Sequence, residues 1–129
     1  MITESCSATP SFFLRSTAEV QQGRVDFHWG SMWWFGSREI GNTTGLTLGL
    51  MTMKPGATND RHLHPNCEEV LYLQQGLLEH RIGEEVVRQQ PGQVLTVPVN
   101  TPHSTTNIGE GEAELIIAFS SGARQFIPC

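Results

Sequence analysis

Short apolar or alternating segments recur along this chain from Gly23 onward, separated by glycine, proline or asparagine at intervals of about eight to twelve residues. Alternation with a period of two places every second side chain on the same face of a strand, so these segments are predicted to be strands. The predicted strands cover residues 25–29, 32–35, 46–54, 69–74, 77–82, 85–89, 93–97, 103–107, 112–119 and 124–127. Few stretches favour a helix, and the pattern is typical of an all-β sandwich or barrel.

Glycines at two short connections predict tight turns. Gln74-Gln75-Gly76 and Gly83-Glu84 contain residues that can adopt positive φ, so we expect the strands over 69–74, 77–82 and 85–89 to form an antiparallel meander. The run over 46–54 carries apolar side chains on both faces. It is therefore predicted to be buried by the interior on one side and by a second sheet or a partner chain on the other.

The first 22 residues have a different character from the rest of the chain. Small polar residues dominate there, apart from the apolar group Phe12-Phe13-Leu14. Such a segment is usually loosely ordered unless it docks on a neighbour, and this apolar group could dock on a second subunit. We therefore predict an N-terminal arm over 1–22, a barrel domain over 23–129 and a homodimer.

Composition narrows the classes of partner and location. A chain of 129 residues has room for one domain, and three widely spaced cysteines indicate reduced thiols rather than a disulfide framework. A formal net charge of −5 with eight lysines and arginines argues against nucleic acid, whose binding depends on clustered basic residues. With neither a long apolar run nor a signal-peptide pattern, we predict a cytoplasmic protein without a membrane partner.

Four side chains form the candidate site. His62 and His64 are two residues apart, so on an extended strand both imidazoles lie on one face. Pro65 and Asn66 favour a turn that would bring Glu69 back towards them. Imidazole nitrogens and a carboxylate suit a divalent transition metal such as Fe, Mn, Ni or Zn. With His103 as a fourth ligand, an octahedral shell would keep two positions open for water, substrate or dioxygen.

The same residues resemble the two sequence motifs of the cupin family. The first motif, G-x5-H-x-H-x4-E-x6-G, is matched by Gly56, His62, His64, Glu69 and Gly76. The second, G-x5-P-x-G-x2-H-x3-N, is matched by Gly92, Pro98, His103 and Asn107, with Asn100 in place of the inner glycine. Asparagine tolerates left-handed backbone angles better than other residues with a Cβ, so the turn before His103 is expected to survive.

The resemblance implies a jelly-roll β-barrel, commonly dimeric, with one metal held by His62, His64, Glu69 and His103. It covers most of residues 23–127. Cupins include dioxygenases, decarboxylases, isomerases, lyases, cyclases and binding proteins, so the fold does not determine the activity. No organic cofactor is expected.

Strand parity suggests the surroundings of the metal. Leu71 and Leu73 share the face of Glu69, while Val70 and Tyr72 lie outside; Thr105 and Asn107 share the face of His103. The candidate substrate-binding residues are Trp33, Phe35, Met51, Met53, Leu71 and Leu73, although core or interface packing is favoured for the aromatic residues and methionines. Three arginines, Arg38, Arg61 and Arg81, are possible anchors for an acidic substrate and more often surface charges.

The candidate acid–base residues are Glu69 and His80, whose imidazole has an ordinary pKa near neutrality. The first functional hypothesis is a dioxygenase-type oxidoreductase acting on a small oxygen-bearing organic substrate. The second is a non-redox, Lewis-acid isomerase, lyase or cyclase, in which Glu69 or His80 moves a proton. The third is a module that binds or senses a small ligand without turnover.

Overall fold

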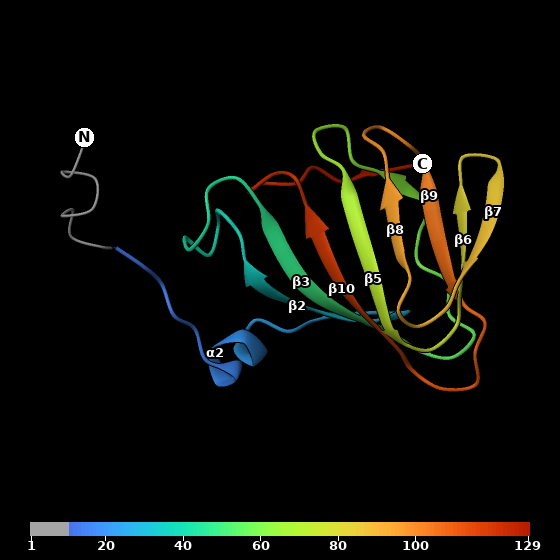
Figure 1. Cartoon of the computed structure of the whole chain (residues 1–129), viewed down its shortest axis with the longest axis horizontal. Coiled ribbons are helices and arrows are strands. Elements are labelled where there is room, and N and C mark those ends of the chain that lie inside the picture. The colour runs from blue at the N-terminus through green and yellow to red at the C-terminus, as the bar shows by residue number, and fades with distance from the viewer. Residues whose placement is uncertain (1–10) are drawn as a thin grey trace, which may run out of the picture.

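Antiparallel strands in two facing sheets make up most of residues 11–129, the part of the chain that this computed structural model describes (Figure 1). The elements are α2 (Thr17–Gln22), β1 (Val25–Phe27), β2 (Gly30–Gly36), β3 (Thr47–Met53), β4 (His62–Leu63), β5 (Glu69–Gln75), β6 (Leu78–Ile82), β7 (Glu85–Gln89), β8 (Val94–Val97), β9 (His103–Asn107), β10 (Ala113–Phe119) and β11 (Ile127–Pro128). The all-β prediction is confirmed.

One sheet has the strand order β1-β2-β3-β10-β5-β8, and the other has the order β11-β4-β9-β6-β7. Inward-facing residues of neighbouring strands meet in register, as Leu115 does with Leu73 on one side and Met51 on the other. Leu73, Leu115 and Ile117 are completely buried, and burial of each such side chain stabilises the fold by about 1.5–3 kcal/mol. The core therefore lies between the sheets.

The parity predicted for β5 and β9 is confirmed. Leu71 and Leu73 are buried while Val70 and Tyr72 are exposed, and His103, Thr105 and Asn107 are buried on one face of β9. Strand alternation thus directs the ligand-bearing face of both strands towards the interior.

The predicted three-stranded meander is wrong in one connection. β6 and β7 form a hairpin around Gly83, whose φ is 57°, as expected. β5, however, pairs with β10 and β8, and the chain crosses at Gly76 to the opposite sheet. The crossing places Leu73 and Leu78, both completely buried, on opposite walls of one core. Burial of both apolar faces therefore outweighs the preference of neighbouring segments to pair.

The C-terminal strand and the segment before β1 also differ from prediction. Residues 124–126 form no strand and only Ile127 enters β11, which pairs with the unpredicted short strand β4. Helix α2 begins after Ser16, whose hydroxyl accepts a hydrogen bond from the Glu19 backbone N–H while the Glu19 carboxylate accepts one from the Ser16 N–H. This reciprocal cap was visible in the sequence as Ser-x-x-Glu.

The predicted arm is ordered from residue 11 onward, and its residues 1–10 lie outside the described part of the chain. Arg15 donates to the backbone oxygens of Trp34 and Phe35, at 3.0 and 2.9 Å, and so attaches the arm to β2. Phe12, Phe13 and Leu14 are all exposed. The boundary at residue 22 and the docking of this apolar group on a second subunit stay predictions.

Cys67 is buried and Cys129 exposed, and both thiols are free; Cys6 lies outside the described residues. No helix within residues 11–129 is long and apolar enough to cross a membrane.

Candidate metal centre

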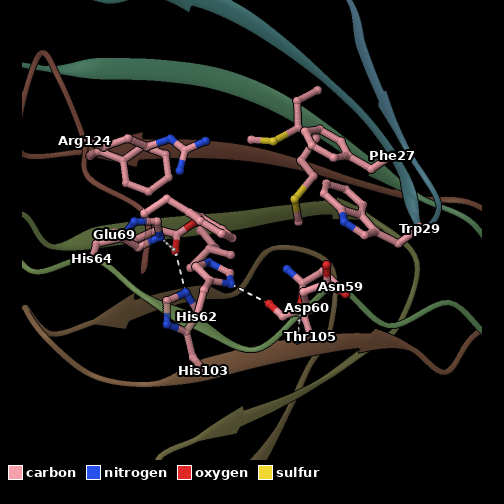
Figure 2. A pocket seen from close by; sticks show the side chains of 15 residues that line it. Phe27, Trp29, Asn59, Asp60, His62, His64, Glu69, His103, Thr105 and Arg124 are labelled. Carbon is pink, nitrogen blue, oxygen red and sulfur yellow. Dashed lines mark hydrogen bonds and ion pairs between the residues drawn. The ribbon is translucent and has the colours of Figure 1, made fainter. Parts of the chain in front are cut away.

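Four buried side chains meet between the two sheets: His62, His64, Glu69 and His103. His62 on β4 lies opposite His103 on β9 in the strand register, His64 follows β4 directly, and Glu69 begins β5. One potential ligand atom of each residue lies within 4.8 Å of the others. The cluster predicted from spacing is therefore assembled, with the side chains pointing toward one another (Figure 2).

The loop between His64 and Glu69 contains the predicted turn at Pro65 and Asn66. The Asn66 side chain fixes this loop to the C-terminal segment, because its Nδ2 donates to the Ala123 oxygen at 3.0 Å and its Oδ1 accepts from the Gln125 N–H at 2.8 Å. The Asn100 N–H donates to the His64 backbone oxygen at 2.8 Å. Both loops that carry ligands are thus held by hydrogen bonds beyond the ligands themselves.

A shared hydrogen-bond pattern orients the three imidazoles. Nδ1 of His62, His64 and His103 lies 2.6, 2.7 and 2.9 Å from the backbone oxygens of Asp60, Gln125 and Thr101. A carbonyl oxygen only accepts, so each Nδ1 carries a proton, and Nε2 of each ring offers a lone pair whenever that ring is neutral. This is the arrangement of metal-ligating histidines, whose other nitrogen is held by a carbonyl or carboxylate.

The charge distribution favours a cation at the centre. Burial acts to raise the pKa of Glu69, but the hydrogen bond from His103 and the nearby His64 ring lower this pKa to about 2, so the carboxylate is ionised. Burial, and secondarily the positive charges possible on His103 and His64, lower the pKa of His62 to about 4. Burial opposes a charge on His103, yet the hydrogen bond that Nε2 of its charged ring donates to Glu69 raises its pKa overall, and a metal ion would take the place of that Nε2 proton.

Nε2 of His64 is completely buried and has no hydrogen-bond partner within residues 11–129. It lies 3.5 Å from Oε1 of Glu69, while Nε2 of His103 lies 3.0 Å from the same oxygen. A buried polar atom without a partner costs about 1–3 kcal/mol. Lone pairs on three nitrogens and one carboxylate, aimed at a common point, fit a divalent transition metal, which would satisfy all four.

A cavity of about 280 Å³ adjoins the cluster. Its apolar wall consists of Phe27, Trp29, Met32, Met51, Leu71, Phe119 and Phe126. Its polar wall beyond the four ligands consists of Asn59, Asp60, Thr105 and Arg124. Figure 2 shows the ligand cluster on one side of this cavity and Phe27 and Trp29 across from it. A small, partly apolar molecule could therefore reach the cluster.

Comparison with known families identifies the fold. The cupin domain pattern matches residues 49–119, more than half of the chain, including β5, β8 and β10 of the larger sheet, β4, β6, β7 and β9 of the smaller one, and all four cluster residues. The chain belongs to the cupin family. Oxalate decarboxylase from Bacillus subtilis, which has Mn(II) centres, superposes with a TM-score of 0.76 at 22% identity, covering 84% of this chain and 30% of that one. At that identity the likeness shows the fold.

Two curated relatives of this cupin differ in their activities. The polyketide synthase protein CurC of Streptomyces cyaneus is 33% identical over 81 residues, which cover 63% of this chain and 52% of CurC. Oxalate oxidase GF-2.8 of Triticum aestivum is 28% identical over 90 residues, which cover 62% of this chain and 39% of that protein. The chain thus spans about half or less of these relatives.

Of the candidate substrate-binding residues, Met51 and Leu71 line the cavity of this cupin, whereas Trp33, Phe35, Met53 and Leu73 do not. Met53 and Leu73 lie deeper in the core. The inward positions of the aromatic segment are those of Met32, which lines the cavity, and Trp34, whose ring packs 6.1 Å from that of Phe119. Trp33, between them, carries Arg24 over its ring at 5.2 Å.

His80, the candidate acid–base residue, is buried and is not among the residues that line the cavity. Its Nδ1 lies 2.8 Å from the Thr105 hydroxyl, and its Nε2 lies 2.7 Å from Oε1 of Gln89. Burial lowers the pKa of His80 despite the opposing hydrogen bond to Gln89, so the ring is neutral near pH 7. Any proton transfer between His80 and the cavity would pass through the Thr105 hydroxyl.

Several cavity residues were not singled out from the sequence. Trp29, Phe119 and Phe126 are apolar residues at or near the ends of predicted strands, and Phe126 stacks on His62 with ring centroids 4.4 Å apart. Pattern alone does not show which apolar residues reach a cavity. Arg124 had no sequence signal, because it lies in the irregular segment before β11.

Proposed function

We propose that this cupin is a metal-dependent oxidoreductase of the dioxygenase type that acts on a small oxygen-bearing organic substrate. The observation that carries the proposal is the convergence of three Nε2 lone pairs and the ionised Glu69 carboxylate beside a cavity with a largely apolar wall. The relatives support redox chemistry at such a site, since one of them is an oxalate oxidase.

His62, His64, Glu69 and His103 would hold one divalent ion. Nitrogen and oxygen ligands of this kind suit Mn, Fe, Ni or Zn, and the Mn(II) centres of the superposed oxalate decarboxylase support Mn among these. When bound, an Fe or Mn ion with open coordination positions supplies the means to activate dioxygen next to a coordinated substrate.

The protein groups would position the substrate and limit water. Met51, Leu71 and Phe119 contribute apolar surface that favours a flat or aliphatic substrate over a hydrated one. Thr105 has its hydroxyl held by His80, and Asn59 accepts a hydrogen bond from the Thr105 N–H at 2.7 Å, so these polar groups have fixed positions at the cavity wall. Fixed polar groups in an apolar pocket orient a ligand.

The test is oxygen consumption. Protein purified anaerobically and reconstituted separately with Fe(II), Mn(II) and Zn(II) would be mixed with a panel of diketones, phenols and keto acids in an oxygen-electrode cell. We expect substrate-dependent oxygen uptake with Fe(II) or Mn(II) and none with Zn(II). If no compound causes oxygen uptake with Fe(II) or Mn(II), the dioxygenase proposal is wrong.

A second candidate function is non-redox isomerisation, elimination or cyclisation, in which a divalent ion acts as a Lewis acid. The similarity to CurC, a polyketide synthase protein, favours it. In this case Glu69, or His80 through the Thr105 hydroxyl, would move the proton. Exchange of substrate C–H hydrogen for deuterium under argon, with Zn(II) as the metal, would support this function.

A binding module without turnover is the third hypothesis from the sequence. It predicts a cavity packed by Trp33, Phe35 and methionine side chains, with no second acid–base residue near the metal. The cavity has a volume of about 280 Å³ that Trp33 and Phe35 do not fill, whereas His80 contacts the cavity wall only through the Thr105 hydroxyl.

We also propose a homodimer. The register aligns Trp33, Leu50, Ile116, Tyr72 and Val94 as one row across the outer face of the larger sheet. Tyr72 and Val94 in this row are exposed, as are Phe12 and Phe13 of the arm, and a second copy could cover them. Sedimentation analysis of wild type and of Tyr72→Glu tests the proposed homodimer. A monomeric wild type would contradict the proposal.

A further inference from the structure

Arg124 is the arginine that lines the cavity, and it lies between β10 and β11. The three arginines considered from the sequence have other positions: Arg61 donates to the Gly83 oxygen at 3.2 Å, Arg38 donates to the Thr44 oxygen, and Arg81 is exposed on β6. Figure 2 shows the guanidinium of Arg124 directed into the cavity, on the side where Glu69 and His64 lie.

Three aromatic rings surround this guanidinium. Its central carbon lies 4.9 Å from the ring centre of Trp34, 5.0 Å from that of Phe119 and 5.9 Å from that of Phe126. Within the described residues 11–129, the guanidinium makes these ring contacts but no hydrogen bond and no ion pair to a protein group. A guanidinium stays charged and has five N–H donors, so it is available to an oxyanion that enters the cavity.

Within the described part of the chain, the acidic groups near Arg124 do not pair with its guanidinium, which stays available to an anion in the cavity. Removal of Arg124 from water lowers its pKa, and the Glu69 carboxylate acts against that change. Glu69, however, is engaged with His103 and His64 and would be neutralised further by a divalent ion. Asp60 at the cavity wall is mostly exposed and lies 3.0 Å from His28. Glu39 lines a neighbouring hollow that also includes Arg124, and no ion pair between the two is present within residues 11–129.

The position of Arg124 relative to the metal centre limits the shape of the anion. The ring of Phe119 lies against Arg124 on one side and meets His64 edge-on, with centroids 5.0 Å apart, on another. One aromatic ring therefore separates the guanidinium from a ligand imidazole. A molecule that reaches both must place its anionic group and its metal-binding oxygen about one ring apart.

We propose that Arg124 is the residue that selects the substrate of this cupin, by pairing with the carboxylate of a small, flat acid whose other oxygen atoms face the metal centre. This proposal rests on the proposed function for the metal centre and adds the substrate class. A bidentate pair between guanidinium and carboxylate in partly buried surroundings typically changes affinity by about tenfold to a hundredfold.

The experiment compares an acid with its uncharged amide. Protein loaded with Zn(II), which prevents oxidation, would be titrated by calorimetry with 3,4-dihydroxybenzoate and with 3,4-dihydroxybenzamide. Both compounds carry the same pair of metal-binding oxygens, and they differ in the charge opposite that pair. We expect wild type to bind the acid at least about tenfold more tightly than the amide.

The variants are Arg124→Gln, Arg124→Lys and, as a matched control, Arg88→Gln on the exposed face of β7, where Arg88 pairs with Glu79. Arg124→Gln should lose the preference for the acid while its affinity for the amide changes less than about threefold. Arg124→Lys should keep part of the preference for the acid, because lysine keeps the positive charge but lacks the two parallel N–H donors of the guanidinium. Arg88→Gln should behave as wild type.

Zinc content and the circular dichroism spectrum of every variant are measured first. A wild type that retains no zinc overturns the proposed function and this proposal with it. If zinc is retained, three results overturn this proposal alone: neither compound binds, both bind wild type equally, or Arg124→Gln keeps the preference for the acid.

Discussion

Replacement of His80 by leucine separates a structural role from a role in metal binding. His80 is only 1% exposed. The Gln89 amide nitrogen donates to the backbone oxygens of Leu71 and Gln93, at 3.0 and 2.8 Å, so Oε1 of Gln89 faces His80 as an acceptor. Nε2 of His80 therefore carries the proton, and Nδ1 accepts from the Thr105 hydroxyl. This proton position is opposite to that of the three ligand histidines.

Leucine has a similar volume and leaves two partners of His80 without a hydrogen bond. Each buried polar group left in this way costs about 1–3 kcal/mol, and Thr105 can turn its hydroxyl towards the cavity, so we expect a total loss of about 3 kcal/mol. For a domain of this length, that loss lowers the melting temperature by about 10 °C. It is a substantial part of a total stability of about 5–15 kcal/mol.

The assay is urea unfolding of the metal-free protein at pH 7.5, followed by tryptophan fluorescence and circular dichroism. The matched control is His28→Leu, because the His28 side chain is 65% exposed and should change stability by less than about 0.5 kcal/mol. Metal content of His80→Leu should equal that of wild type. If the stability of His80→Leu lies within about 0.5 kcal/mol of wild type, the hydrogen bonds of His80 do not stabilise the fold as proposed. If His80→Leu loses bound metal, His80 is not separate from the metal ligands.

Two further predictions follow from backbone strain and from ionisation. Asn100→Ala should cost about 1 kcal/mol and Asn100→Gly almost nothing, because φ at Asn100 is 63°, and equal melting temperatures for the two variants would contradict this explanation. Metal-free protein should lose stability as pH falls from 6.5 to about 4, because the pKa of His62 is lowered to about 4 in the fold and the unfolded chain takes up a proton first. The loss from His62 is about 3 kcal/mol, and the contribution of His103 stays nearly constant over this range, because its pKa is raised and its stabilisation is already present below pH 6.5; urea unfolding between pH 4 and 6.5 that shows constant stability would disprove the prediction.

The metal cluster could be predicted from the sequence because it depends on short-range geometry. A strand period of two places His62 and His64 together, the Pro65-Asn66 turn returns the chain to Glu69, and His103 follows a turn that Asn100 allows. Asn100 is the non-glycine residue with positive φ in the described part of the chain. Each of these features is set by a few neighbouring residues.

The cavity wall depends on contacts between distant segments, which the sequence pattern does not specify. Which members of the aromatic segment of β2 face inward depends on its register against β3, in which Met32 lies opposite the buried Met51 and Trp33 opposite Leu50. Arg124 reaches the cavity because the segment before β11 folds back over the ligand loop, held by Asn66. The crossing at Gly76 likewise follows from filling a common core. Local alternation contains no information about these packing choices.

The central claim is that His62, His64, Glu69 and His103 bind one divalent metal ion. The most direct measurement is the metal content of purified wild type and of the double variant His62→Ala/His64→Ala, by mass spectrometry after dialysis. The account predicts about one ion per chain in wild type, and loss of the ion with an unchanged β-type circular dichroism spectrum in the variant. Undiminished metal content in a folded double variant would contradict it.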